Sequence, residues 1–183
     1  DGIYNGNLTI AANANFYYNA SRPLDANPAN RQATDDYILF NATTNKMEIN
    51  GQIAVNGNLT FTRGGGNDKT IYYTGRGAIL VTGSATLDTN LLTVNGNGTT
   101  ANSFPVNNCF GIMAAGNMVV GSLSQLTIMG AFYAQGTVQC TKQTNVAGTF
   151  VGGYFDMGTN VPHIYQVPTL ADNLPRGMIG AYP

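Results

Sequence analysis

Apolar and polar residues alternate along most of the chain in short runs that are interrupted by glycine. The same order of glycine, apolar, small and polar residues begins at Gly51, Gly77 and Gly130, and each copy has a second glycine six residues later. Alternation with a period of two places every second side chain on one face of a β-strand. The pattern therefore predicts pairs of short strands joined at a tight glycine corner, where a Cβ atom would be unfavourable.

Further copies of the repeat indicate how these strand pairs are arranged. Two shorter copies begin at Gly111 and Gly148, so that Gly111, Gly130 and Gly148 lie 19 and 18 residues apart, and a half copy spans residues 3–10. This spacing is close to one turn of a small β-solenoid, in which each rung buries its apolar face by stacking on its neighbours. We predict an all-β fold, a right-handed parallel β-solenoid (β-helix). An antiparallel β-sandwich is the alternative, because it also has short alternating strands.

The predicted solenoid is a single domain that spans residues 1–183. Residues 1–45 are expected to form an irregular N-terminal rung and cap, and residues 46–161 the repeating rungs. Residues 162–183 are expected to form an extended tail, because they contain four prolines, which do not fit central strands.

Two segments outside the repeat carry more detailed expectations. Residues 11–36 predict a long loop with one short helix, since Asn27 followed by Pro28 is typical of a helix start. The Pro-rich tail is expected to pack along the body through its apolar residues, Ile164, Tyr165, Val167 and Leu170.

The chain is almost uncharged, which excludes several classes of protein. Charged residues make up 9% of the sequence, the formal net charge is −1, and there are 23 glycines and ten tyrosines. These values exclude a coiled coil and a basic nucleic-acid-binding module of the usual kind. With 43% hydrophobic residues, disorder is also excluded. No apolar run is long enough to span a membrane, and the composition favours an extracellular or cell-surface location.

Several segments resemble a known family. Gly75–Gly83, Phe110–Val120 and Gly130–Gly136 carry the glycine and apolar alternation, and Ile164–Gly177 ends the chain with Tyr-x-x-Pro-x-Leu-x-x-x-Leu-Pro. These residues resemble the β-solenoid domain of large type IV pilin-like proteins, which include PilX-type and competence-associated minor pilins. The resemblance covers about residues 46–177. Residues 1–183 contain no counterpart of the apolar N-terminal helix of such pilins, so an excised domain and a separate surface protein remain alternatives.

The resemblance implies a non-enzymatic structural or adhesive module of a type IV pilus or pilus-like filament, with other filament subunits or a surface as partners. An alternative is a module at a pilus tip that binds DNA or a glycan. Its candidate ligand patch combines cations with aromatic rings that can stack, namely Arg63, Lys69, Tyr72, Tyr73 and Arg76.

A polysaccharide-active β-helix enzyme is a weaker alternative. Such enzymes use clustered carboxylates, whereas the nine acidic residues here are scattered and His163 is the single histidine. We therefore assign no catalytic, cofactor-binding or metal-binding residue and expect no cofactor.

Two sets of residues are candidates for covalent modification. Cys109 and Cys140 are a candidate disulfide pair, and small apolar core residues are the equally favoured alternative. Candidate glycosylation sites of the Asn-x-Ser/Thr type are Asn7, Asn19, Asn41, Asn58 and Asn97.

Overall fold

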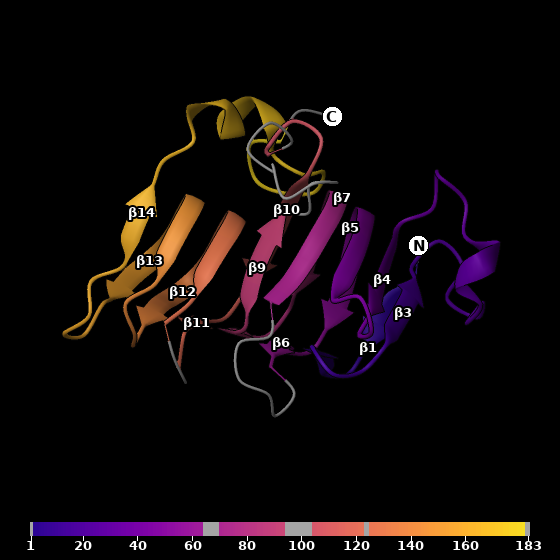
Figure 1. The fold of residues 1–183 in the computed structure, drawn as a ribbon, viewed down its shortest axis with the longest axis horizontal. Helices are drawn as coiled ribbons and strands as arrows, with labels where there is room; N and C mark the ends of the chain where they lie inside the picture. Colours follow the sequence, from indigo (N-terminus) through magenta and orange to yellow (C-terminus); the bar gives the residue numbers. More distant parts are fainter. Residues whose placement is uncertain (1, 64–69, 94–103, 123–124, 182–183) are drawn as a thin grey trace.

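The computed structural model describes residues 2–63, 70–93, 104–122 and 125–181 (Figure 1). The described part consists mainly of β-strands that join into one sheet of fourteen strands, so the all-β expectation is confirmed. The strands, in chain order, are β1 (Ile3–Asn5), β2 (Leu8–Ala11), β3 (Phe16–Asn19), β4 (Tyr37–Asn41), β5 (Lys46–Asn56), β6 (Leu59–Thr62), β7 (Thr70–Val81), β8 (Ala85–Asp88), β9 (Asn90–Thr93), β10 (Cys109–Ala114), β11 (Met118–Val120), β12 (Thr127–Cys140), β13 (Asn145–Asp156) and β14 (His163–Tyr165).

The strands pair in parallel along three ladders, and Figure 1 shows them side by side from the N-terminal end to β14. The first ladder has the order β1-β5-β7-β10-β12-β13. The second has the order β2-β6-β8-β11-β12-β13. The third uses the first residues of the long strands, in the order β5-β7-β9-β12-β13-β14. Parallel pairing along all three contradicts the antiparallel sandwich.

Alternating residues fill one continuous interior. In β5 every second residue from Met47 to Val55 is buried. Aromatic rings meet in this interior, where Phe110 lies 5.7 Å, between centroids, from both Phe61 and Tyr73. Fully burying one large apolar side chain stabilises a protein by about 1.5–3 kcal/mol, so this interior provides the main stabilising contribution.

Glycine is required at corners where neighbouring rungs approach closely. Gly75 has a φ of +90°, and Gly148 has a φ of +138°. A Cβ atom at Gly75 would collide with the carbonyl oxygen of Ile49, and one at Gly148 with that of Gly130. Both the backbone conformation and the contact therefore exclude a side chain at these positions.

A polar residue directly after a corner glycine links each rung to the next. The side-chain oxygen of Asn7 accepts a hydrogen bond from the backbone N–H of Asn58 at 3.0 Å, and that of Asn58 accepts one from Ser84 at 2.8 Å. The series continues from Ser84 to Asn117 at 3.1 Å and from Asn117 to Thr137 at 2.9 Å. We call these five residues the corner ladder. Its side-chain oxygens accept hydrogen bonds from backbone N–H groups that lie at the corners between the strands.

The N-terminal segment is more regular than the sequence indicates. The expected short helix is present as a 3-10 helix, η1 (Pro28–Asn30), and the side chain of Asn27 accepts a hydrogen bond from the N–H of Ala29 at 3.0 Å. The expectation of a loop over residues 11–36 is wrong in part, since β3 lies within it. β3 pairs with β4, and β4 with β5, in antiparallel fashion.

The C-terminal tail is also only partly as expected. It contains β14 and a 3-10 helix, η3 (Pro168–Asn173), and it passes back over β10 (Figure 1). Leu170 and Met178 are buried there against the outer face of the first ladder. Ile164 and Tyr165, in contrast, are exposed, so the prediction that they pack on the body is wrong.

The corner ladder provides a test of how the rungs are held together. Replacing Asn58 with Ala removes its hydrogen bonds to Ser84 and Asn7. We expect the free energy of unfolding, measured by urea denaturation, to fall by about 1 kcal/mol. Asn13→Ala is the control, because Asn13 is exposed and its side chain has no hydrogen bond within the described residues. Equal denaturation midpoints for the two variants would contradict a stabilising role of the ladder.

Candidate functional site

The structure separates the two tyrosines of the predicted ligand patch. Tyr72 and Tyr73 are consecutive in β7, so their side chains lie on opposite faces of the strand. Tyr72 is exposed, whereas Tyr73 is fully buried and donates its hydroxyl hydrogen to the carbonyl oxygen of Met129 at 2.9 Å. Burial raises the pKa of the Tyr73 phenol well above its usual value. Tyr73 is therefore a core residue and not part of a ligand surface.

The guanidinium of Arg76 is held by hydrogen bonds to backbone carbonyl oxygens. Its Nη1 donates to the carbonyl oxygens of Pro105 at 2.8 Å and Val106 at 2.6 Å, and its Nη2 donates to that of Asn173 at 2.9 Å. One guanidinium thus joins β7 to the segment before β10 and to the tail. Because its donors face backbone carbonyls, Arg76 is not available as a free cation for a ligand.

Arg63 and Lys69, the other two cations of the predicted patch, do not add a described free cation beside Tyr72. Arg63 donates from Nε to the carbonyl oxygen of Asp88 at 3.1 Å. Lys69 lies outside the described residues. With Tyr73 in the core and Arg76 bound to the backbone, the described residues do not form the predicted patch.

The two cysteines are free and buried. Cys109 packs in the outer cluster beneath the tail, while Cys140 packs in the interior. Burial raises the pKa of the Cys109 thiol to about 12 and that of Cys140 to about 11. The predicted disulfide is therefore not formed, and the alternative of two small apolar core residues describes them.

The candidate glycosylation sites have different environments. Asn7 and Asn58 are exposed members of the corner ladder. Asn19 is buried and bound to Asp35, so the prediction of a modification site there is wrong. Asn41 is exposed. Asn97 lies outside the described residues.

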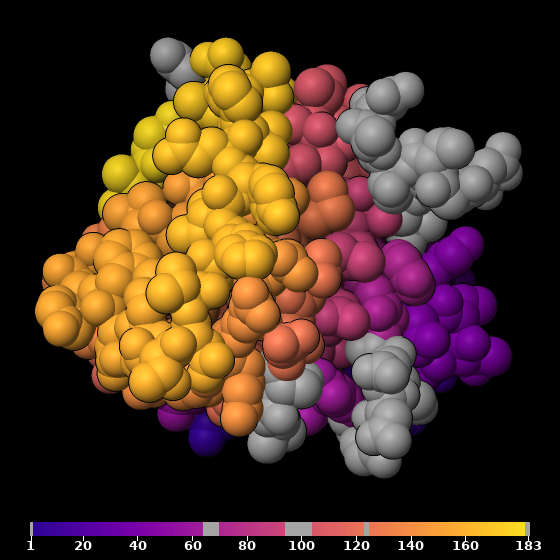
Figure 2. All heavy atoms as spheres, turned by 60° about the vertical axis from the view of Figure 1, so that its left-hand side comes forward, coloured from indigo at the N-terminus to yellow at the C-terminus, as the bar shows by residue number. Residues whose placement is uncertain are grey.

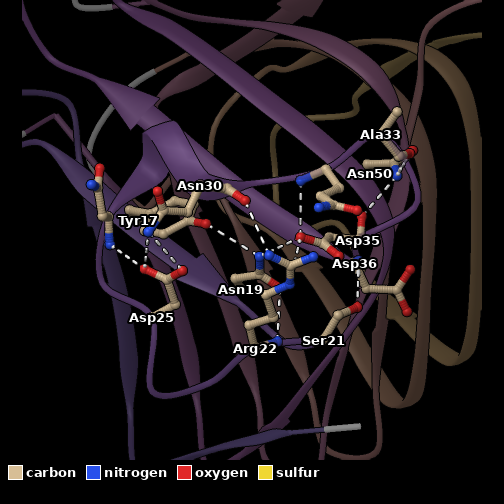
Figure 3. A network of polar contacts seen from close by, with 12 residues as sticks. Tyr17, Asn19, Ser21, Arg22, Asp25, Asn30, Ala33, Asp35, Asp36 and Asn50 are labelled. Carbon is tan, nitrogen blue, oxygen red and sulfur yellow. Dashed lines mark hydrogen bonds and ion pairs between the residues drawn. The ribbon is translucent and has the colours of Figure 1, made fainter.

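A polar network fixes the loop between β3 and β4 (Figure 3). The carboxylate of Asp35 accepts hydrogen bonds from the N–H of Gln32 and from Nδ2 of Asn19, both at 2.9 Å, and lies 3.5 Å from Nε of Arg22. The hydrogen bonds of Gln32 and Asn19 lower the pKa of Asp35. Asn50 joins the network to β5 through the carbonyl oxygen of Asp35 at 2.8 Å. The loop is thus anchored to β3 through Asn19 and to β5 through Asn50.

The end of the stack at β13 and β14 carries a concentration of exposed apolar side chains. Tyr154 is 67% exposed and Tyr165 is 61% exposed. Within the described residues, β14 pairs only with β13, and the second half of β13 pairs only with β12. Figure 2 turns this end toward the viewer. We call it the open end, formed by Val151, Tyr154, Phe155, Val161, Ile164 and Tyr165.

At the opposite end of the stack, the third ladder is covered. There, β3 and β4 continue the third ladder in antiparallel fashion, which ends the parallel repeat. The ring of Tyr4 meets those of Phe16 and Tyr18 edge-on, at centroid distances of 6.3 and 5.2 Å. Within the described residues β1 and β2 also pair with one strand each, so strand edges do not distinguish the two ends. The open end is the stronger candidate for an interaction surface because its exposed apolar side chains are concentrated there.

Among the described residues, no group of three or more His, Cys, Asp or Glu side chains is arranged to hold a metal ion. No described helix has the length and apolar character needed to cross a membrane.

Comparison with known proteins shows a likeness in fold. No protein-family model matches the chain, and no curated protein matches it. Among solved structures, the chain is similar to the crystal structure of the competence-associated pilin ComZ from Thermus thermophilus, with a TM-score of 0.61 and 15% sequence identity. The similarity covers 91% of this chain and 33% of that chain. The chain therefore shares its all-β fold with about a third of that protein.

The buried thiols predict how stability depends on pH. Raising the pH from 9 to 11 should lower the free energy of unfolding, because the unfolded state releases thiol protons that the folded state retains. Each thiol contributes about 1.4 kcal/mol per pH unit between its unfolded and folded pKa values. Urea denaturation under reducing conditions should show a smaller decline for Cys109→Ala than for the parent chain. An equal decline would show that the Cys109 thiol ionises normally when folded.

Proposed function

We propose that the chain is a pilus-associated surface module that contacts other subunits of a type IV pilus or a related filament. The likeness in fold to a competence-associated pilin over 91% of the chain is the main support. The low charge and the abundance of glycine and tyrosine favour an extracellular or cell-surface location. The open end provides an apolar surface of the kind that buried subunit interfaces use.

The proposed architecture is a right-handed parallel β-solenoid. Its support is the pairing of strands that are far apart in sequence, since Gly51 pairs with Gly77 and Gly130 with Gly148 in parallel register. Crossover connections between parallel strands of one sheet are right-handed in about 98% of cases, which favours the right-handed form. An experimental structure in which the chain turns in the opposite sense from β10 to β12 would contradict this handedness.

The proposed role is structural or adhesive and not enzymatic. Three of the nine acidic side chains are each held in a separate local contact. Glu48 binds Arg31 at 2.9 Å, Asp35 binds Asn19, and Asp88 binds Ser122 at 2.6 Å. Paired catalytic carboxylates lie within about 5–9.5 Å of each other across a sugar-binding groove, and separate engagement of these groups supports the non-enzymatic proposal.

Site-specific crosslinking in the cell that produces the protein tests the proposal. A photo-crosslinking amino acid placed at Tyr154 or Tyr165 should form covalent products with filament subunits, because both side chains are exposed at the open end. Tyr154→Lys should reduce the amount of the protein in sheared filaments severalfold, because burying an unpaired charge in an interface is costly.

The matched control is the same crosslinker at Leu24, which is fully exposed in the loop between β3 and β4, far along the stack from β14. It should give few products with filament subunits. Equal products from Leu24, or an absence of filament subunits among the products from Tyr154 and Tyr165, would argue against the open end as the subunit contact.

A further inference from the structure

A groove of about 660 Å³ lies between the β3–β4 hairpin and the loop that carries η1. This volume is within the range of about 300–1,000 Å³ that is typical of small-molecule sites. It lies outside the open end and is separate from the predicted patch. The lining combines aromatic and other apolar side chains with amides, and its principal residues are Asn15, Tyr17, Pro28, Arg31, Leu39 and Asn41.

The apolar part of the groove is formed by the outward face of the hairpin. Tyr17 and Leu39 lie directly opposite each other in the antiparallel register, and both are half-buried. Their neighbours in β4, Ile38 and Phe40, point into the interior and are fully buried. A flat, partly accessible ring beside a leucine can therefore accept the apolar face of a ligand.

Two asparagines give the groove oriented hydrogen-bond donors. The Oδ1 atom of Asn15 accepts a hydrogen bond from the N–H of Ala42 at 2.8 Å. The Oδ1 atom of Asn41 accepts from the N–H groups of Thr43 at 2.9 Å and Thr44 at 3.2 Å. Since each oxygen is held by the backbone, each amide presents its NH₂ group away from that contact. Neither NH₂ group has a hydrogen-bond partner among the described residues.

The charge of the groove is already compensated. Nη1 of Arg31 donates to the carbonyl oxygen of Pro28 at 2.8 Å, and Nη2 contacts Glu48 at 2.9 Å. The same guanidinium lies 5.4 Å from the centre of the Tyr37 ring. Arg31 thus holds the wall of the groove and is paired with a carboxylate, which makes a phosphate or another anion a poor ligand.

The wall opposite the hairpin is held in place before any ligand binds. Asp25 accepts hydrogen bonds from the N–H of Asn27 at 2.9 Å and from Nδ2 of Asn30 at 3.0 Å, and Arg22 donates to the carbonyl oxygen of Asn30 at 3.2 Å (Figure 3). These contacts fix η1 on both sides. A site whose walls are already ordered loses little conformational entropy on binding.

We infer that this groove binds a neutral saccharide. A sugar ring has an apolar face that fits against Tyr17 and Leu39, and its ring and hydroxyl oxygens accept hydrogen bonds from the amides of Asn15 and Asn41. The paired state of Arg31 selects against phosphate-bearing ligands such as DNA. This inference rests on the groove alone and does not depend on the proposed contact with filament subunits.

Titration followed by nuclear magnetic resonance tests the inference. The ¹⁵N-labelled protein is titrated separately with maltotriose, cellotriose and the trimer of N-acetylglucosamine, and with a single-stranded oligothymidylate. We expect at least one trisaccharide to shift the backbone amide signals of residues 15–17, 29–31 and 39–41 and the side-chain NH₂ signals of Asn15 and Asn41. A lack of these shifts with all three trisaccharides, or shifts with the oligothymidylate alone, would overturn the inference.

Conservative variants separate binding from folding. Asn15→Asp and Asn41→Asp keep the oxygen that accepts the backbone hydrogen bonds but remove the NH₂ donor, so each should weaken binding about tenfold. Tyr17→Ala should abolish the shifts, whereas Leu24→Ala, outside the groove, should leave them unchanged. The spectrum of each free variant verifies that it is folded. Unchanged binding in a folded Asn15→Asp, Asn41→Asp double variant would overturn the assigned role of the amides.

Discussion

Parallel stacking in register is the constraint on which the rest of the structure depends. Neighbouring strands lie about 4.8 Å apart, so residues at one position of successive rungs are in contact along the stack. Like charges would repel each other at that spacing, which accounts for a chain with only 9% charged residues. Small and uncharged polar residues satisfy the same constraint. At the corners, asparagine, serine and threonine donate or accept hydrogen bonds from rung to rung.

Periodicity predicted the regular part of the fold because stacking repeats a local requirement. Several glycines that begin copies of the repeat align in the structure, as Gly51 with Gly77 and Gly130 with Gly148 show. Gly111 differs, since it pairs with Ala78 and Ala131, and Met178 of the tail packs over it. A contact with a segment far along the chain leaves no periodic signal, so the reason for glycine at that position was not predictable.

The candidate surfaces were less predictable than the rungs. Alternation shows that Tyr72 and Tyr73 face opposite sides, but it does not show which of them is buried. The β3–β4 hairpin carries no glycine repeat, and the groove beside it depends on the polar network of the following loop. The open end depends on where pairing stops, which is a property of the assembled sheet. Each of these features arises from contacts between segments that do not share a repeat.

The bond from Arg76 to Asn173 joins residues that are 97 positions apart. Before the tail has been synthesised, the outer face formed by Ala78, Cys109 and Ala131 lacks the cover that Leu170 and Met178 provide, although the interior of the rungs can already be filled. Residues 170–178 therefore complete the body last, in the direction of synthesis. Until then the chain presents an exposed apolar strip that includes the Cys109 thiol, and Nη2 of Arg76 lacks its acceptor on Asn173. The tail thus determines when this apolar strip and its thiol are shielded from solvent.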